Sequence, residues 1–275
     1  MSRKLFCELH PYAYKISWFK ETLKRYFVDL LSNNKFSKIK SQEKLSIIIK
    51  THKSLIRRKL GNAELQLQEN KAKNLELATP KVTGILIKPG ETFSFWHLVG
   101  HCTKRKGYLE GLNIKKHAPT RGTAGGMCQF TNLLHWLVLH SDLDIVEHHH
   151  HNEFDLFPDY NRTIPFGTGT SIVYNYLDYR FKNNTDNIYQ IIVWTDEEYL
   201  NGELRAEKSI EIKPHIIETE SYFYEKNEKF YRHNKIFRKL IDKRTGAILS
   251  EYLLLENNAL VCYDSDLIDK ERIRK

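Results

Sequence analysis

The sequence has few cysteines, and they are scattered. Its four cysteines are Cys7, Cys102, Cys128 and Cys262, and none of them belongs to a closely spaced pair such as Cys-x-x-Cys. Scattered cysteines do not build the disulfide framework of a small secreted domain, and closely paired ligands are the usual sign of structural zinc. We therefore expect reduced thiols, with a bond between Cys102 and Cys128 left open by the spacing.

Long apolar runs are also missing. Near the N-terminus, five charged residues interrupt an amphipathic pattern and exclude a membrane-spanning helix there: Lys20, Glu21, Lys24, Arg25 and Asp29. The same region has no apolar signal-peptide core followed by a small-residue cleavage site. We expect a protein that is cytoplasmic or peripherally attached to a membrane.

Several motifs of common enzyme and binding classes are absent as well. The chain has no glycine-rich phosphate loop of the Walker or dinucleotide type, and it has no serine nucleophile elbow. Basic residues scattered among aromatics near the N-terminus do not by themselves make a nucleic-acid module. We therefore predict no cofactor and no nucleic-acid partner.

The positive charge of the chain is concentrated at its N-terminus. The formal net charge is +9, and residues 1–60 hold 15 Lys and Arg against 4 Asp and Glu. The same region contains an apolar stripe at helical spacing, made of Ile16, Phe19, Leu23, Tyr26, Phe27 and Leu30. This pattern fits a helix that packs on the main domain, which is the commoner case, or a helix that lies on an anionic membrane surface.

Apolar spacing and turn residues together predict an α+β protein. Further helices are expected at 45–56 and 62–78, a short strand and a Pro-Gly turn within 84–96, and loops at 100–122. Strand-like runs separated by turns fill the second half, at 170–181, 189–195, 203–212, 218–224, 229–233 and 251–255.

These elements suggest three parts. They are a basic helical N-terminal region at 1–60, a mixed core domain at 61–205 with a cysteine-bearing helix packed on a sheet, and a β-rich extension at 206–275. The last boundary rests only on a charged, turn-like stretch at 201–208.

A glycine pair followed by a cysteine carries the chemistry of this chain. Gly125 and Gly126 lead into an apolar helical pattern, and Cys128 and Gln129 lie in its first turn. Unpaired amides and the positive end of a helix dipole favour the thiolate of a cysteine placed there. We therefore prefer a nucleophilic Cys128, with Gln129 as an amide donor beside it, to the simpler interpretation of a buried core cysteine.

Four consecutive histidines follow an apolar run downstream of the cysteine. If this segment is a strand, His149 and His151 lie on one face and their two neighbours on the other. A histidine that reaches Cys128 can take the thiol proton and later return a proton to a leaving amine. Two alternatives remain, an exposed polar strand edge and a zinc site made of Cys128, His149 and His151.

Several separate motifs occur in the order that is typical of one protein family. They are 69–75 with 77–78, 87–96, 125–129 with 132–134, and 177–178 followed by 183–186. On these motifs the chain resembles the VanW family, which is named after an accessory protein of vancomycin B-type resistance clusters. Residues 169–171 depart from the family, since Gly169-Thr170-Ser171 stands where Asp-Ala-Thr is common. Ala124 also precedes Gly125 and Gly126 where the family often has a third glycine.

The resemblance implies a role at the cell envelope, as a cysteine-dependent L,D-transpeptidase or L,D-carboxypeptidase acting on peptidoglycan stem peptides. The family's motif places the nucleophile at Cys128 and the general base at His151, with Gln129 helping to stabilise the oxyanion. Supporting or substrate-binding positions would be Gly125, Gly126, Asn132, His149, Asn152 and Asp178. With Gly169 in place of the acid, the histidine would be oriented by Asn152, Asp155 or Asp178. The alternatives are a non-catalytic protein that binds peptidoglycan precursors and a zinc-dependent hydrolase that uses Cys128 and the histidines.

Overall fold

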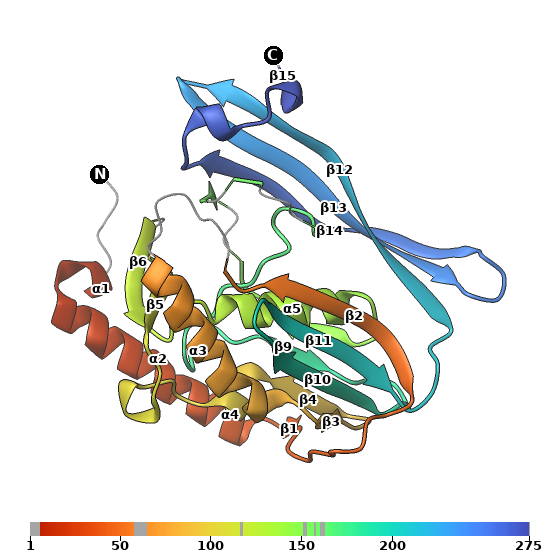
Figure 1. Cartoon of the computed structure of the whole chain (residues 1–275). Coiled ribbons are helices and arrows are strands. Elements are labelled where there is room, and N and C mark those ends of the chain that lie inside the picture. The colour runs from red at the N-terminus through yellow and green to blue at the C-terminus, as the bar shows by residue number, and fades with distance from the viewer. Residues whose placement is uncertain are drawn as a thin grey trace.

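The fold is described from a computed structural model of the whole chain (Figure 1). It describes residues 6–57, 65–115, 118–150, 153–156, 158–159 and 163–274. The α-helices lie in the first half of this part of the chain and strands fill the second half, which confirms the predicted α+β class. Of the helices described, none combines the length and the apolar character that crossing a bilayer requires.

Two helices open the chain. They are α1 (Phe6–Leu9) and α2 (Pro11–Leu31), and they lie on the outside of the body (Figure 1). The His10 ring accepts a hydrogen bond from the Tyr12 amide at 3.2 Å, and Pro11 occupies the first turn, where its missing N–H costs nothing. The predicted N-terminal helix is thus confirmed.

An antiparallel sheet with strand order β2-β11-β10-β3 forms the centre of the body. Its strands are β2 (Ile47–Leu55), β3 (Ile85–Ile87), β10 (Tyr189–Thr195) and β11 (Tyr199–Ala206). The helix predicted at 45–56 is therefore wrong. Consecutive β-branched isoleucines favour an extended chain, and β2 pairs with β11 over almost its whole length. This pairing also joins the predicted N-terminal region to the predicted core domain.

A second, smaller sheet has the order β1-β4-β9-β7. It comprises β1 (Lys35–Phe36), β4 (Glu91–Ser94), β7 (Asp144–Glu147) and β9 (Arg180–Lys182). The helix α4 (Phe95–Val99) follows β4 directly. The strand expected at 170–181 is mostly wrong, because the chain turns there with a bridge between Val173 and Leu177 and becomes a strand only at Arg180.

Two further helices and a hairpin complete the body. The helices are α3 (Leu65–Val82) and α5 (Cys128–Leu139), and the hairpin pairs β5 (Glu110–Lys115) with β6 (Ala118–Thr123). This hairpin corrects the prediction of loops at 100–122. Helix α5 packs on β2 and β11, so closely that a Cβ on Gly202 would lie 2.6 Å from Leu133 Cδ2. The predicted packing of the cysteine-bearing helix on a sheet is confirmed.

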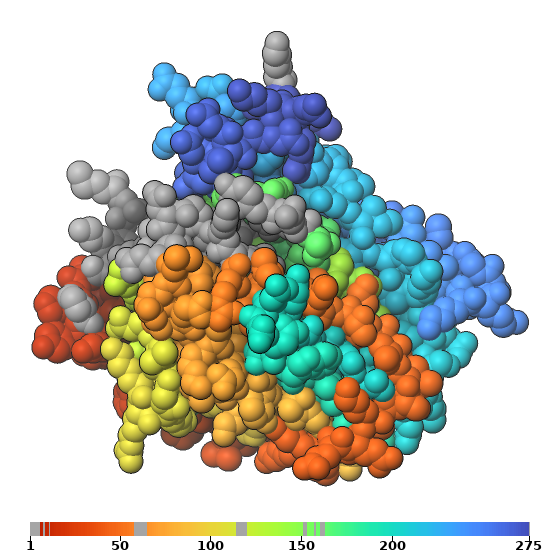
Figure 2. Space-filling view, in the orientation of Figure 1, coloured from red at the N-terminus to blue at the C-terminus, as the bar shows by residue number. Residues whose placement is uncertain are grey.

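The C-terminal part is a five-stranded sheet of order β15-β12-β13-β14-β8. Its strands are β8 (Phe154–Asp155), β12 (Ile212–Lys226), β13 (Lys229–Asp242), β14 (Ile248–Val261) and β15 (Ile273–Arg274). The three short runs predicted at 218–224, 229–233 and 251–255 are segments of the three long strands. In Figure 2 these strands, in blue, stand out from the rest of the body at the top and right.

One hydrophobic core holds the two sheets of the body and its helices together. Fully buried side chains come from α3, α5 and both sheets, including Leu75, Phe93, Phe130, Leu134, Tyr179 and Ile191. Aromatic rings meet inside it, with Phe93 stacked on Phe181 at 4.5 Å between centroids. Helix α5 is therefore a buried, rigid support for the residues at its N-terminal end.

Candidate functional site

The glycine pair before Cys128 allows two backbones to touch. A Cβ on Gly125 would lie 2.1 Å from the Gly111 carbonyl carbon, and a Cβ on Gly126, at φ +89°, would lie 2.3 Å from Lys71 Cγ. The Gly126 amide donates to the Leu112 carbonyl at 3.0 Å. The turn is thus pressed against the β5–β6 hairpin and α3, where no side chain fits.

Cys128 is the first residue of α5 and is half-buried. Burial raises the pKa of its thiol, although the amides of Ile172 and of Cys128 itself, which point to the sulfur, act in the opposite direction. The expected stabilisation of the thiolate by the helix terminus is therefore outweighed by desolvation, and this prediction is corrected. A nucleophilic Cys128 needs a base to take its proton.

Segment 169–172 is tied to the first turns of α5. Asn132 Oδ1 accepts hydrogen bonds from the Thr170 amide at 2.6 Å and from the Thr170 hydroxyl at 2.9 Å. The hydroxyls of Thr131 and Thr170 are also hydrogen bonded, and Thr131 donates to the Cys128 carbonyl at 3.2 Å. These bonds hold the Ile172 amide over the thiol. The residues aligned with the family's Asp-Ala-Thr thus form one wall of the cysteine site.

The same segment holds the histidines. His148 Nε2 and the Gly169 carbonyl oxygen are 3.0 Å apart, and the Ser171 amide donates to the His149 carbonyl at 2.6 Å. The Gly169 carbonyl therefore orients an imidazole at the position where the family's carboxylate is missing. Segment 169–172 contacts Cys128 on one side and the histidines on the other, so the structure brings the two predicted halves of the site together.

The described histidines do not continue the preceding strand, because β7 ends at Glu147. Beyond it, His148 stacks on His150 with 5.5 Å between ring centroids and on His135 of α5 with 4.1 Å. His135 is also hydrogen bonded to the Tyr179 hydroxyl at 3.3 Å. The imidazoles of His135, His148 and His150 thus stack in one column. This arrangement differs from the alternating faces of a strand.

Burial keeps the imidazoles of His135 and His148 neutral. Desolvation and the neighbouring rings hold the pKa of His135 well below its usual value, and desolvation lowers the pKa of His148 to about 4. His148 therefore has the free lone pair that a general base requires at neutral pH, but its lowered pKa makes it a weak base.

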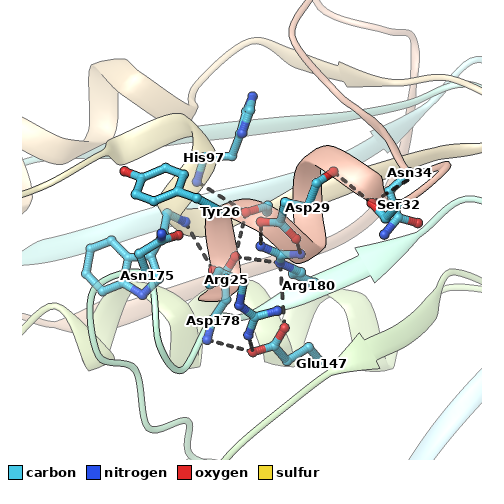
Figure 3. A network of polar contacts seen from close by, with 12 residues as sticks. Arg25, Tyr26, Asp29, Ser32, Asn34, His97, Glu147, Asn175, Asp178 and Arg180 are labelled. Carbon is cyan, nitrogen blue, oxygen red and sulfur yellow. Dashed lines mark hydrogen bonds and ion pairs between the residues drawn. The ribbon is translucent and has the colours of Figure 1, made fainter. Parts of the chain in front are cut away.

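His149 points to a different partner, Glu147. Its Nε2 donates to Glu147 Oε1 at 3.1 Å, and the same oxygen accepts from the Asp178 amide at 2.9 Å and from Arg25 of α2 (Figure 3). Burial opposes the ionisation of Glu147, but these hydrogen bonds bring its pKa below the usual value. The carboxylate that contacts a histidine of the cluster is thus Glu147, which the sequence analysis did not select.

The two carboxylates described among the predicted orienting residues are engaged elsewhere. Asp178 accepts from Ser94 Oγ at 2.5 Å and from Arg180 Nε at 2.7 Å, and burial raises its pKa. Asp155 binds Arg232 at 3.3 Å and the Tyr263 hydroxyl at 3.0 Å. Both carboxylates therefore tie strands and loops together.

The remaining predicted site residues divide into two groups. His151 and Asn152 lie outside the described residues, so their roles stay predictions. The Gln129 amide donates to Ser54 Oγ at 2.9 Å and to the Leu55 carbonyl at 2.8 Å, which fastens α5 to β2. Within the part of the chain that is described, no group of three or more His, Cys, Asp or Glu residues could hold a metal ion.

The sequence does carry a signal for the residues that were missed on α5. Cys128, Thr131, Asn132 and His135 are spaced by three, four and seven residues from the cysteine, which places them on one side of the helix. A polar stripe on an otherwise buried, apolar helix indicates a site. Glu147 has a weaker signal, its position two residues before His149.

Comparisons with known proteins find relatives of this chain. A family model described as VanW like protein matches residues 70–205, which contain the glycine pair, Cys128 and the histidines. The chain is 37% identical over 196 residues to the vancomycin B-type resistance protein VanW of Enterococcus faecalis, covering 71% of each protein. It is 29% identical over 118 residues to the uncharacterized protein YoaR of Bacillus subtilis, covering 42% of this chain and 36% of that protein. No solved structure matches the chain.

Proposed function

The chain belongs to the VanW family, and from this we propose that it is a cysteine-dependent acyltransferase that acts on peptidoglycan stem peptides at the cell envelope. One observation carries the proposal. Segment 169–172 directs an amide at the Cys128 thiol and binds His148 through the Gly169 carbonyl, which joins a potential nucleophile and a potential base in one site.

The first step is the transfer of the Cys128 proton to a neutral imidazole, because the buried thiol does not ionise unaided at neutral pH. When His148 Nε2 donates to the Gly169 carbonyl, Nδ1 carries the lone pair that accepts a proton. The family resemblance indicates His151 for the same role. Single substitutions at these two histidines decide between them.

The chemical steps then follow those of a thiol acyltransferase. The thiolate attacks the carbonyl carbon of the third stem residue, and a new S–C bond forms. The imidazolium returns its proton to the leaving nitrogen as the C–N bond to the terminal D-amino acid breaks. Attack on the thioester by an amine of a second stem gives a cross-link, whereas attack by water gives a trimmed stem.

Stabilisation of the oxyanion falls to backbone amides at the start of α5, which carry the positive end of the helix dipole. Gln129 is expected to contribute indirectly, since its amide group holds α5 against β2. Its substitution is therefore expected to disturb the position of Cys128 and not to remove a direct donor.

Intact mass spectrometry of the reduced, metal-stripped protein incubated with tetrapeptide stems tests the proposal. We expect a covalent adduct, or trimmed and cross-linked stems, for the wild type and for Cys262→Ser, which changes an exposed cysteine of the C-terminal part. Cys128→Ala should abolish both. Loss in His148→Ala or in His151→Ala identifies the base. A product that persists in Cys128→Ala would refute the proposal.

The raised pKa of Cys128 favours a second candidate, a non-catalytic protein that binds peptidoglycan precursors. In that case stem peptides bind the wild type and Cys128→Ala equally, measured by calorimetry, and neither an adduct nor a product forms. The two candidates thus predict opposite results for the same pair of proteins.

A further inference from the structure

Helix α2 docks on the protein through a polar face. Asp29 accepts two hydrogen bonds of 2.6 Å from the guanidinium of Arg180 (Figure 3). The Thr22 carbonyl accepts one of 3.2 Å from Asn175 Nδ2. Thr22 is buried. The contacts that fix this helix are therefore mostly ionic and polar, although a helix on a protein surface usually turns its apolar side to the core.

A second side of α2, about a third of a turn around the helix from these contacts, is apolar and exposed. Six large side chains at helical spacing form what we call the outer stripe: Tyr12, Ile16, Phe19, Leu23, Phe27 and Leu30. Their exposed fractions run from 40% to 79%. Exposed apolar residues on a soluble protein are usually scattered singly, whereas these form one contiguous face along the helix. Such a face indicates contact with another apolar surface.

The charges of α2 are sorted around the outer stripe. At 100° per residue, Lys15 borders it on one side and Lys20 and Lys24 on the other, and all three are exposed. The two acids of the helix, Glu21 and Asp29, lie toward the docked side and are partly buried. The outer stripe is thus flanked by basic residues on both of its sides.

We propose that α2 is an interfacial helix that buries the outer stripe in an anionic bilayer surface, while its polar face holds the domain. Lysines along both edges of an apolar face are typical of helices that lie in a membrane interface, because they attract anionic lipid headgroups. A second copy of this chain is a poorer occupant, because the same lysines would then face one another. This inference concerns the attachment of the protein and goes beyond the proposed chemistry.

Vesicle co-sedimentation of the full chain tests the proposal, with vesicles of phosphatidylglycerol and phosphatidylcholine compared with phosphatidylcholine alone. We expect binding to the anionic vesicles, and at least about tenfold weaker binding for Phe19→Ser/Leu23→Ser. Lys20→Glu/Lys24→Glu should weaken binding at least about fivefold for each lysine, and added salt should act in the same direction.

The control Ile248→Ser/Leu249→Ser changes two exposed apolar residues of β14 and should bind like the wild type. Thermal unfolding checks that each variant is folded, which we expect because all of these side chains are exposed. Cys128→Ala should also bind normally, which separates this test from that of the acyl transfer. No binding by the wild type, or equal binding by the stripe variant, would overturn the proposal. A wild-type dimer that the stripe variant converts to a monomer, without vesicle binding, would assign the stripe to a second copy instead.

Discussion

The contact of Gly125 with Gly111 makes a quantitative prediction about the turn before Cys128. In Gly125→Ala the new Cβ would lie 2.1 Å from the Gly111 carbonyl carbon, 2.3 Å from its oxygen and 2.5 Å from its Cα. Carbon atoms in contact are normally about 3.5 to 4.0 Å apart, so the two backbones must separate by more than about 1 Å. No flexible side chain can move aside, because all three atoms belong to the backbone.

The magnitude follows from what that separation breaks. The Gly126 amide donates to the Leu112 carbonyl at 3.0 Å, and the Ala124 amide donates to the Leu109 carbonyl at 2.8 Å. Two hydrogen bonds at about 1 kcal/mol each, together with overpacking of at least about 1 kcal/mol, give a loss of about 3 kcal/mol. For a domain of this size that corresponds to a fall in Tm of about 6 to 12 °C.

Denaturant and thermal unfolding measure this loss, and Gly169→Ala is the matched control. A Cβ on Gly169 would lie 3.6 Å from Asn132 Oδ1, which is an ordinary contact, so we expect a change below about 1 kcal/mol. If Gly125→Ala is no less stable than Gly169→Ala, the close approach does not constrain the turn and the reasoning is refuted.

Three further predictions concern charge and protonation. Asp29→Asn weakens the bidentate bond to Arg180 and should cost about 1 to 3 kcal/mol of unfolding free energy, measured in urea. Alkylation of Cys128 by iodoacetamide should accelerate about tenfold per pH unit and not level off below pH 9, since its pKa is raised; a plateau at neutral pH would contradict this. Stability should fall as pH drops from 6.5 toward 4, because the unfolded chain protonates His140 and His148 before the native state does, and His140→Gln should reduce that fall.

Matched controls exist for each of these measurements. Asp186→Asn removes a carboxylate that is 94% exposed and should leave stability unchanged. Alkylation at Cys7 of α1 supplies the reference rate. His215→Gln changes an exposed histidine of β12, and its stability should fall below pH 6.5 as that of the wild type does. If the stability of His140→Gln falls as steeply between pH 6.5 and 4 as that of the wild type, burial of the His140 ring does not cause the fall.

Local sequence patterns correctly predicted those elements in which the residues' own preference for helix or strand agrees with the observed structure. The helix after Cys128 has an apolar face of the right period, and it starts at the cysteine as expected. The strand at 189–195 is observed with the same bounds, because a β-branched and aromatic run is bounded there by turn residues. The backbone that approaches the glycine pair, that of Gly111, is set by the fold.

Long-range pairing explains the largest error. In residues 45–56 the apolar positions fit a helix and a strand about equally well, since Ile47, Ile48 and Ile49 are consecutive. The choice is made by β11, whose backbone pairs with β2 across a sequence separation that no local pattern reveals. The Gln129 amide adds to the same choice by bonding to Ser54 and Leu55.

The orientation of the histidines could not be predicted for the same reason. Alternation assumes a strand, whereas the chain leaves β7 at Glu147 and stacks His148 on His135 of α5. The polar positions on α5 were readable as one side of a helix, but the carbonyl that orients His148 belongs to Gly169, twenty-one residues away, and has no side chain to recognise. Backbone groups that replace a missing side chain are invisible in a sequence.

Glu147 connects the histidines to α2. It accepts hydrogen bonds from His149 and from Arg25, and the Asp178 amide donates to the same oxygen. Removing Arg25 would leave the half-buried Glu147 carboxylate with fewer hydrogen-bond donors, so the pKa of Glu147 would rise. Once Glu147 is protonated, His149 has no ionised partner there. Helix α2 therefore has the outer stripe on one side, and from its docked side it stabilises the negative charge of Glu147 next to the histidines. If α2 lies on a membrane, its docking determines both where the protein is held and the protonation state of the group beside His149.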